Sequence, residues 1–164
     1  MPQVAVGFRQ ARKAVSHGLQ ASLTPMRFER GAIETIRRGK RWTTQRILAP
    51  NGQEVLYLLN FYLPRFLNLP FDEKLTTIFH ELWHIGPEFD GDLRRHEGRC
   101  YVHGPRQSDF DEVARHIAQA WMAGDPPREL WVFLHDDFSD LKARYGSVYG
   151  ARFAAPKLIP VDQR

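Results

Sequence analysis

Apolar and polar residues recur with a helical period between residues 70 and 85. Pro70 marks the start of this helix, and Asp72 is the expected N-cap. The apolar side chains follow at spacings of three and four residues and therefore share one side of the helix: Leu75, Ile78, Phe79 and Leu82. The pattern predicts an amphipathic helix over about residues 72–85, whose opposite side carries polar groups.

Weaker patterns predict the elements before this helix. A basic amphipathic stretch predicts a helix over residues 4–17, and a second short helix is expected over residues 28–39. Residues 42–49 and 54–63 flank the turn sequence Pro50-Asn51-Gly52 and together predict a β-hairpin. The second strand is almost continuously apolar, which is typical of a strand covered on both faces.

Two further helices are predicted after a polar stretch at residues 86–99 and a short apolar segment at residues 100–102. Ser108 is the expected N-cap of the first, and Gly124-Asp125-Pro126-Pro127 ends it. The remaining pattern predicts a strand at 130–134, a short helix at 137–145 and an extended segment at 148–159. Helices mixed with an early hairpin predict an α+β fold.

The polar side of the helix at 72–85 carries the sequence His80-Glu81-Leu82-Trp83-His84. Two histidines four residues apart project to the same side of a helix, so both imidazoles can bind one metal ion. The glutamate beside the first histidine can then take a proton from water activated by that metal. The motif predicts a Zn²⁺ site with His80 and His84 as ligands and Glu81 as the general base.

A catalytic zinc site usually has three protein ligands and one open position. The candidates for the third ligand are His96 and His103, because both lie in the irregular stretch where the chain can turn back toward the metal. The histidine that does not bind the metal is expected to contact a ligand or the substrate.

The segment from the motif to His96 resembles putative phage-type and related archaeal metallopeptidases. In these small zincins a HELxHI helix is followed by a Phe-x-Gly-x-Leu-Arg-x-His segment, which stands here at residues 89–96. The resemblance covers residues 54–116 and implies a small zincin-like domain, a short sheet with an active-site helix carrying HExxH. It also implies that His96 is the third ligand.

A second resemblance favours the other histidine. SprT-like proteases place their third histidine in a His-Gly pair before a helix with an early phenylalanine, and His103-Gly104 before Phe110 is similar, although the spacing here is longer. The metzincin spacing fails, because Pro87 stands where glycine is needed and Asp90 where the third histidine is needed. We prefer His96 over His103 by a small margin.

Length and charge complete the prediction. The chain has 164 residues, which fits a single metallopeptidase-like domain over 1–164, with a metal-site core at residues 54–123. Residues 1–50 carry a net charge of +8 and the rest −4, so residues 1–45 form a basic N-terminal region that could contact nucleic acid weakly. Cys100 is the single cysteine, and the N-terminus lacks the apolar run of a signal peptide. We therefore expect a cytoplasmic protein without membrane partners.

These observations predict a zinc-dependent metallopeptidase that hydrolyses a peptide or protein substrate. One alternative is a nucleic-acid-associated, SprT-like protease or binding protein, with Trp42 as a stacking residue. The other is a metal-binding module without hydrolytic activity. Glu81 argues against the second alternative, because a purely structural site needs no base and usually closes with a fourth protein ligand.

Overall fold

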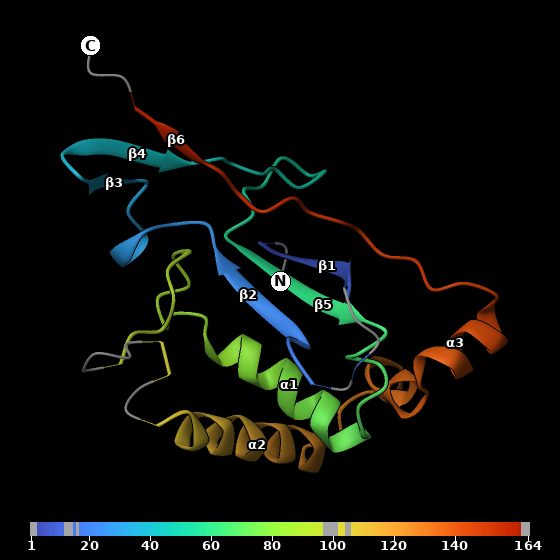
Figure 1. The fold of residues 1–164 in the computed structure, drawn as a ribbon. Helices are drawn as coiled ribbons and strands as arrows, with labels where there is room; N and C mark the ends of the chain where they lie inside the picture. Colours follow the sequence, from blue (N-terminus) through green and yellow to red (C-terminus); the bar gives the residue numbers. More distant parts are fainter. Residues whose placement is uncertain (1–2, 12–14, 16, 97–101, 104–105, 162–164) are drawn as a thin grey trace.

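The computed structural model of the chain describes residues 3–11, 15, 17–96, 102–103 and 106–161. These residues form a small α+β fold with three α-helices and two three-stranded sheets (Figure 1). The strands are β1 (Val4–Gln10), β2 (Ala21–Pro25), β3 (Glu34–Arg37), β4 (Lys40–Thr44), β5 (Tyr57–Leu63) and β6 (Leu158–Pro160). The helices are α1 (Phe71–Trp83), α2 (Gln107–Ala123) and α3 (Phe138–Tyr145), with short 3₁₀ turns at Glu29–Gly31, Arg128–Leu130 and Val132–His135.

The first sheet has the order β1-β5-β2. β5 occupies its centre, pairing parallel with β1 and antiparallel with β2. Tyr57 to Phe61 are all buried, so β5, which is apolar except for Asn60, is covered on both faces as predicted. Leu59 and Phe61 face the helices, whereas Leu58 packs with Met26 and Val55 on the other face.

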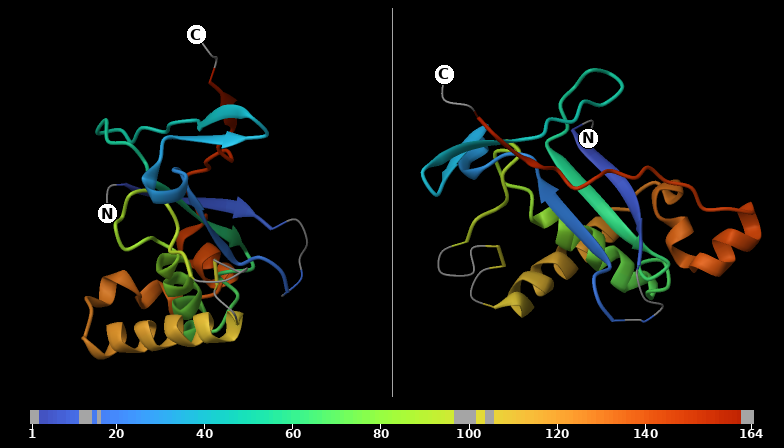
Figure 2. Two further views of the ribbon diagram at one scale, coloured as in Figure 1. Left: turned by 90° about the vertical axis from the view of Figure 1, so that its left-hand side faces the viewer. Right: turned by 45° about the horizontal axis from the view of Figure 1, so that its top comes forward.

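Helices cover one face of this sheet. α1 lies against the sheet beside β2, and α2 packs against α1, so that the two helices form successive layers (Figure 1). Figure 2 shows the second sheet, β3-β4-β6, at the other side of the first sheet from these helices. The segment between α3 and β6 passes beside β1, where Phe8 N–H donates to the carbonyl of Ala151. Among the described residues, no helix combines the length and apolarity that crossing a bilayer would need.

Both helices predicted in the N-terminal third are wrong. Residues 4–10 form β1, in which Val4 and Phe8 pack on the core side of the sheet. Residues 34–44 form the β3–β4 hairpin, whose turn residues Arg38 and Gly39 both have positive φ, as a two-residue hairpin turn requires. In β1, pairing with the distant strand β5 outweighs the weak helical period. In residues 34–44, the turn at Arg38-Gly39 outweighs it.

The predicted hairpin across Pro50-Asn51-Gly52 is correct only near its turn. Leu48 pairs with Glu54, but β4 pairs with β3 and β6, and β5 pairs with β1 and β2. The apolar run of β5 needs neighbours on both edges and covers on both faces, which one hairpin partner cannot supply. The strand predicted at 130–134 is also wrong: 3₁₀ turns there bring Leu134 into the core.

The three later helices lie where the sequence predicted them, although two of their caps differ. The N-cap of α1 is Pro70, with Asp72 in the first turn, and the N-cap of α2 is Arg106. α3 begins with a capping box between Asp137 and Asp140. Part of the predicted extended segment forms β6. Most of the apolar segment predicted at 100–102 lies outside the described residues.

Lys74 fastens α1 to the segment before α3. Its side chain is 2 % exposed, and its Nζ donates to the carbonyls of Leu134 (2.8 Å) and Asp136 (2.7 Å). Burial lowers the pKa of this amine, and nearby carboxylates oppose the shift. We expect Lys74→Met to lower the free energy of unfolding by about 2 kcal/mol, because both carbonyls lose their donor. Urea denaturation measures this, with exposed Lys142→Met as the control; an equal effect of both variants would contradict it.

Candidate metal centre

Three histidines meet above the C-terminal half of α1. His80 and His84 come from one helical turn, and His103 comes from the connection to α2. One nitrogen of each ring can be chosen so that all three lie within 4.8 Å of one another. The Nε2 atoms of His80 and His84 are 3.2 Å apart. The three side chains are therefore close enough to bind one metal ion.

This donor set fits zinc. Zn–N bonds of 2.0–2.1 Å in a tetrahedron place neighbouring nitrogens about 3.3 Å apart, close to the separation of the two Nε2 atoms. His80 Nδ1 lies 2.8 Å from Asp111 Oδ1, so the Nδ1–H donates to the carboxylate and the Nε2 lone pair is left for a metal. Three imidazoles leave the fourth position open, which is the pattern of catalytic sites.

Burial keeps the two helical histidines in the neutral form that binds metals. It lowers the pKa of His80, where the Asp111 carboxylate opposes the shift. Burial, together with the neighbouring histidines His80, His103 and His96, lowers the pKa of His84 to about 3. A neutral imidazole needs no proton removed before it coordinates a cation, so the site is ready for metal at neutral pH.

Glu81 lies beside the histidines and is only 8 % exposed. Burial raises the pKa of its carboxyl group to about 7, although a hydrogen bond with the backbone of Leu23 in β2 opposes the shift. A carboxylate with this pKa can accept a proton and release it again near neutral pH. The motif predicts that Glu81 lies beside the two histidines, whereas its burial and its contact with β2 depend on the tertiary fold.

The ring of Phe110 in α2 packs against the three histidines. Its ring is buried and stacks on His84, with ring centroids 4.5 Å apart, and it meets His80 and His103 edge-on. Asp111, the next residue, orients His80. The sequence did not assign Asp111, because nothing local links a residue on α2 to one on α1 that lies 31 positions earlier in the chain.

His96 lies near the cluster but not within it. Its ring is 5.7 Å from that of Phe110, and its Nε2 is buried without a hydrogen-bond partner among the described residues. The group whose nitrogens come together consists of His80, His84 and His103. This grouping favours His103 as the third ligand, whereas the sequence led us to prefer His96. The choice between them stays a prediction that metal analysis can decide.

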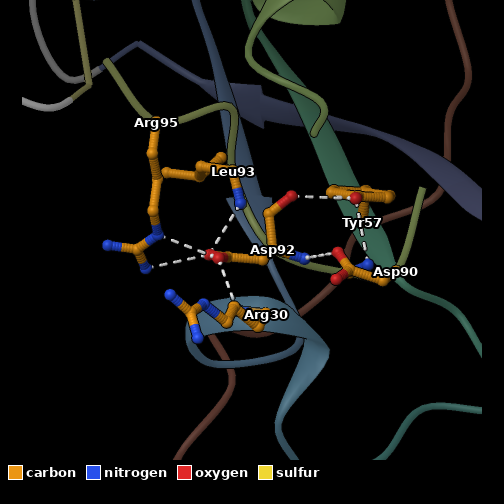
Figure 3. Close-up of polar contacts among 7 residues, drawn as sticks. Arg30, Tyr57, Asp90, Asp92, Leu93 and Arg95 are labelled. Atoms are coloured by element: carbon orange, nitrogen blue, oxygen red, sulfur yellow. Dashed lines mark hydrogen bonds and ion pairs between the residues drawn. The ribbon is translucent and has the colours of Figure 1, made fainter. Parts of the chain in front are cut away.

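The loop after α1 folds back on the helix and is held by buried polar contacts (Figure 3). The Tyr57 hydroxyl accepts a hydrogen bond from Gly91 N–H (3.0 Å) and donates to the carbonyl of Asp92 (2.9 Å). The Asp92 carboxylate accepts from Arg30 N–H and pairs with the guanidinium of Arg95. These contacts fix the path of the chain between the motif helix and His96.

Arg94, Arg99 and Tyr101 follow the motif and are candidate donors to an oxygen atom of a ligand beside the metal position. Arg94 is engaged elsewhere: its Nε donates to the carbonyl of Trp83 (2.9 Å), and its guanidinium stacks 3.7 Å from the centre of the Trp83 ring. Arg99 and Tyr101 lie outside the described residues.

A groove of about 1050 Å³ opens above the cluster. α1 and α2 form two of its walls, and residues 19–23, which include the start of β2, form the third. His80, Glu81, His84 and His103 all line it, so a molecule in the groove would reach both the metal position and the glutamate. Asp111 and Arg115 of α2 line the same wall.

We expect Asp111→Ala to weaken zinc binding by about 10–100-fold, because His80 would lose the acceptor that fixes its ring and tautomer. Asp111→Asn keeps an acceptor oxygen without the charge and should fall between this variant and the wild type. Competition with a chromophoric chelator measures the affinity. The neighbouring exposed Glu112→Gln variant is the control, and a loss as large as that of Asp111→Ala would contradict the assignment.

The zinc-free protein should show a pH dependence that Glu81 causes. Its pKa of about 7 exceeds the usual 4.5, so its contribution to stability is full below pH 4.5 and is lost as the pH rises through 7. His84 acts in the opposite direction, since its lowered pKa removes stability as the pH falls from 6.5 toward 3. Comparing wild type with Glu81→Gln cancels the histidine contribution.

The free energy of unfolding of Glu81→Gln minus that of the wild type should therefore increase by about 3 kcal/mol as the pH rises from 4.5 to 7.5. Urea denaturation with chelator present at several pH values gives this difference. A difference in the free energy of unfolding that does not vary with pH would show that folding does not raise the pKa of Glu81.

The chain matches no family model, no curated protein and no solved structure in the three comparisons. Its function is therefore argued from the geometry of the site.

Proposed function

We propose that the protein is a zinc-dependent metallopeptidase. The observation that supports this most strongly is the buried Glu81, whose pKa is near 7, beside three histidines whose nitrogens lie within 4.8 Å of one another. A structural zinc site would have no use for a poised base next to its ligands. The open groove above the cluster gives a substrate access to both the metal position and Glu81.

A zinc ion held by His80, His84 and His103 would supply Lewis acidity toward the scissile carbonyl and the attacking water. Glu81 would take the proton of that water on its carboxylate and pass it to the leaving amine. Asp111 would hold His80 in the tautomer that offers Nε2 to the metal. Phe110 would exclude water from beneath the ligands.

The free edge of β2 supports a polypeptide as substrate. β5 is the central strand of the sheet, and β2 is the edge strand beside the groove. The carbonyl of Gln20 accepts from Tyr62 N–H of β5, and Met26 N–H donates to the carbonyl of Leu56 just before β5. The alternation of the ladder therefore turns the backbone groups of Ala21 and the carbonyl of Leu23 outward. An extended chain can add to such an edge by backbone hydrogen bonds.

This function is consistent with the resemblance of residues 54–116 to phage-type metallopeptidases and of the His103-Gly104 pair to SprT-like proteases. Membership of a zincin-like family is part of the proposal. The grouping of His103 with the helical pair favours the SprT-like ligand arrangement.

The test combines metal content with hydrolysis. Purified protein should contain about one zinc per chain and cleave an unfolded protein such as reduced casein, and a chelator should stop cleavage until zinc is restored. Mass spectrometry of the products would locate the cleaved bonds. A protein that holds zinc but cleaves none of a diverse set of unfolded proteins and peptides would instead be a metal-binding module.

A further inference from the structure

A second pocket, of about 780 Å³, adjoins the end of the groove that lies away from the histidines. The ends of β1 and β5 and the residues before β2 form its walls, and Leu19 lines both this pocket and the groove. Leu19 is therefore the point at which the groove and the second pocket meet.

The second pocket is positively charged. Arg9, Arg65, Arg152 and His17 line it, and none of its described lining residues is acidic. Arg152 and His17 are exposed, and Arg9 is half-buried. Such a concentration of cations without a carboxylate attracts an anionic group.

Two of the arginines are held in place by backbone carbonyls. Arg65 donates to the carbonyls of Val15 (3.0 Å) and Leu19 (2.8 Å), so it fixes the wall between the two pockets. Arg9 Nη2 donates to the carbonyl of Phe153 (3.0 Å), whereas its Nε is buried and has no acceptor among the described residues. The contact with Phe153 holds the guanidinium of Arg9 at the wall of the second pocket.

The distance between the two pockets sets how a ligand would bridge them. Leu23 of β2 contacts Glu81, and Leu19 lies four residues earlier along the same segment. Four extended residues span about 13 Å, and a peptide paired with β2 advances by the same step. A group four or five residues from the bond above Glu81 would therefore lie at the second pocket.

We propose that this pocket binds a carboxylate of the peptide that occupies the groove, four or five residues from the scissile bond. The substrates would then be polypeptides with an acidic side chain, or a C-terminal carboxylate, at that position. The inference rests on the proposed function for the identity of the groove's occupant. It adds a selectivity that the metal site itself does not have.

The charges along the groove favour a peptide over a nucleic acid. Asp72 and Glu73 of α1 line the groove on the way to the second pocket, and Asp111 lies near the histidines. A strand with a phosphate at every nucleotide would pass these carboxylates and be repelled, whereas a peptide with a single carboxylate would be neutral along that path.

Binding, not hydrolysis, tests the proposal. Full-length Glu81→Gln protein supplied with zinc is titrated into fluorescent, end-blocked peptides of about ten uncharged residues, long enough to reach from one pocket to the other. One glutamate is moved along the peptide, and each peptide is compared with its glutamine twin by fluorescence anisotropy. At one position or two adjacent ones, glutamate should tighten binding about tenfold.

Arg152→Gln and Arg9→Gln should each reduce this preference for glutamate, whereas Arg37→Gln, an exposed arginine in β3 outside both pockets, should leave it unchanged. Thermal unfolding of each variant checks that the fold is intact. The proposal is wrong if no position favours glutamate more than about twofold, which includes the case of no measurable binding. It is also wrong if Arg37→Gln removes the preference equally.

A further arm distinguishes the nucleic-acid alternative. If a single-stranded oligonucleotide binds more tightly than every glutamate peptide, and Arg152→Gln removes that binding, the pocket binds phosphate and the carboxylate assignment fails. Failure of the proposed function would look different: wild-type protein would cleave no peptide, while the glutamate preference of the Glu81→Gln protein would still be present.

Discussion

Glu81→Gln should slow peptide hydrolysis by about a thousandfold while zinc binding stays within about threefold of wild type. The amide has the size of the carboxyl group but cannot take a proton from water, and general acid–base catalysis contributes about 10²–10⁴-fold to such reactions. Glu81 is not one of the residues whose ligand atoms come together, so its replacement should preserve the metal position.

Initial rates on a cleaved peptide and zinc content by mass spectrometry give the two quantities. Glu88→Gln is the matched control, because Glu88 is an exposed glutamate in the loop just after the motif. Cleavage by Glu81→Gln at the wild-type rate would remove the assignment of Glu81 as the base and would leave the hydrolysis without an explanation in this site.

His103→Ala should lower the affinity for zinc by about a hundredfold or more, whereas His96→Ala should lower it by about tenfold or less. Removing one of three protein ligands leaves the ion with two imidazoles from a single helical turn. His96 lies beside the cluster, so its removal changes the surroundings of His84 but not the group of close nitrogens. The same variants should rank in the same order for hydrolysis.

Chelator competition on both variants, with the exposed His116→Ala as the control, would decide between the two histidines. If His96→Ala loses the metal and His103→Ala keeps it, the third ligand is His96, as the resemblance to phage-type metallopeptidases implies. In that case the loop held by Tyr57 and Asp92 carries a ligand.

The elements that the sequence predicted well are those whose pattern is local and strong. α1 has a clear apolar stripe, α2 ends at a glycine followed by prolines, and β5 is apolar except for Asn60. Of the elements it missed, β3 and β4 form a local hairpin with its own turn signal, whereas β1 depends on a distant partner. Val4, Val6 and Phe8 alternate along β1 as in a strand, but the signal is short and lies beside basic residues that also fit a helix; pairing with β5, more than fifty residues later in the chain, decides it.

The candidate site divides in the same way. The i, i+4 spacing of His80 and His84 and the glutamate between them follow from helix geometry alone, so the motif itself determined that these groups share one side of α1. Which side of the protein they face is a tertiary matter. The packing of α2 and the edge of β2 over that side buries Glu81, and with it comes the raised pKa of its carboxyl group.

By itself the sequence determined the α+β class, the motif helix and the shared side of that helix on which His80, Glu81 and His84 lie. Only the tertiary structure gathered His103 with them, brought Asp111 to His80 and made β2 the edge of the groove. The physical reason is that these relations join residues far apart in the chain. Local periodicity indicates which side of a segment packs in the core, but it does not indicate which other segment packs against that side.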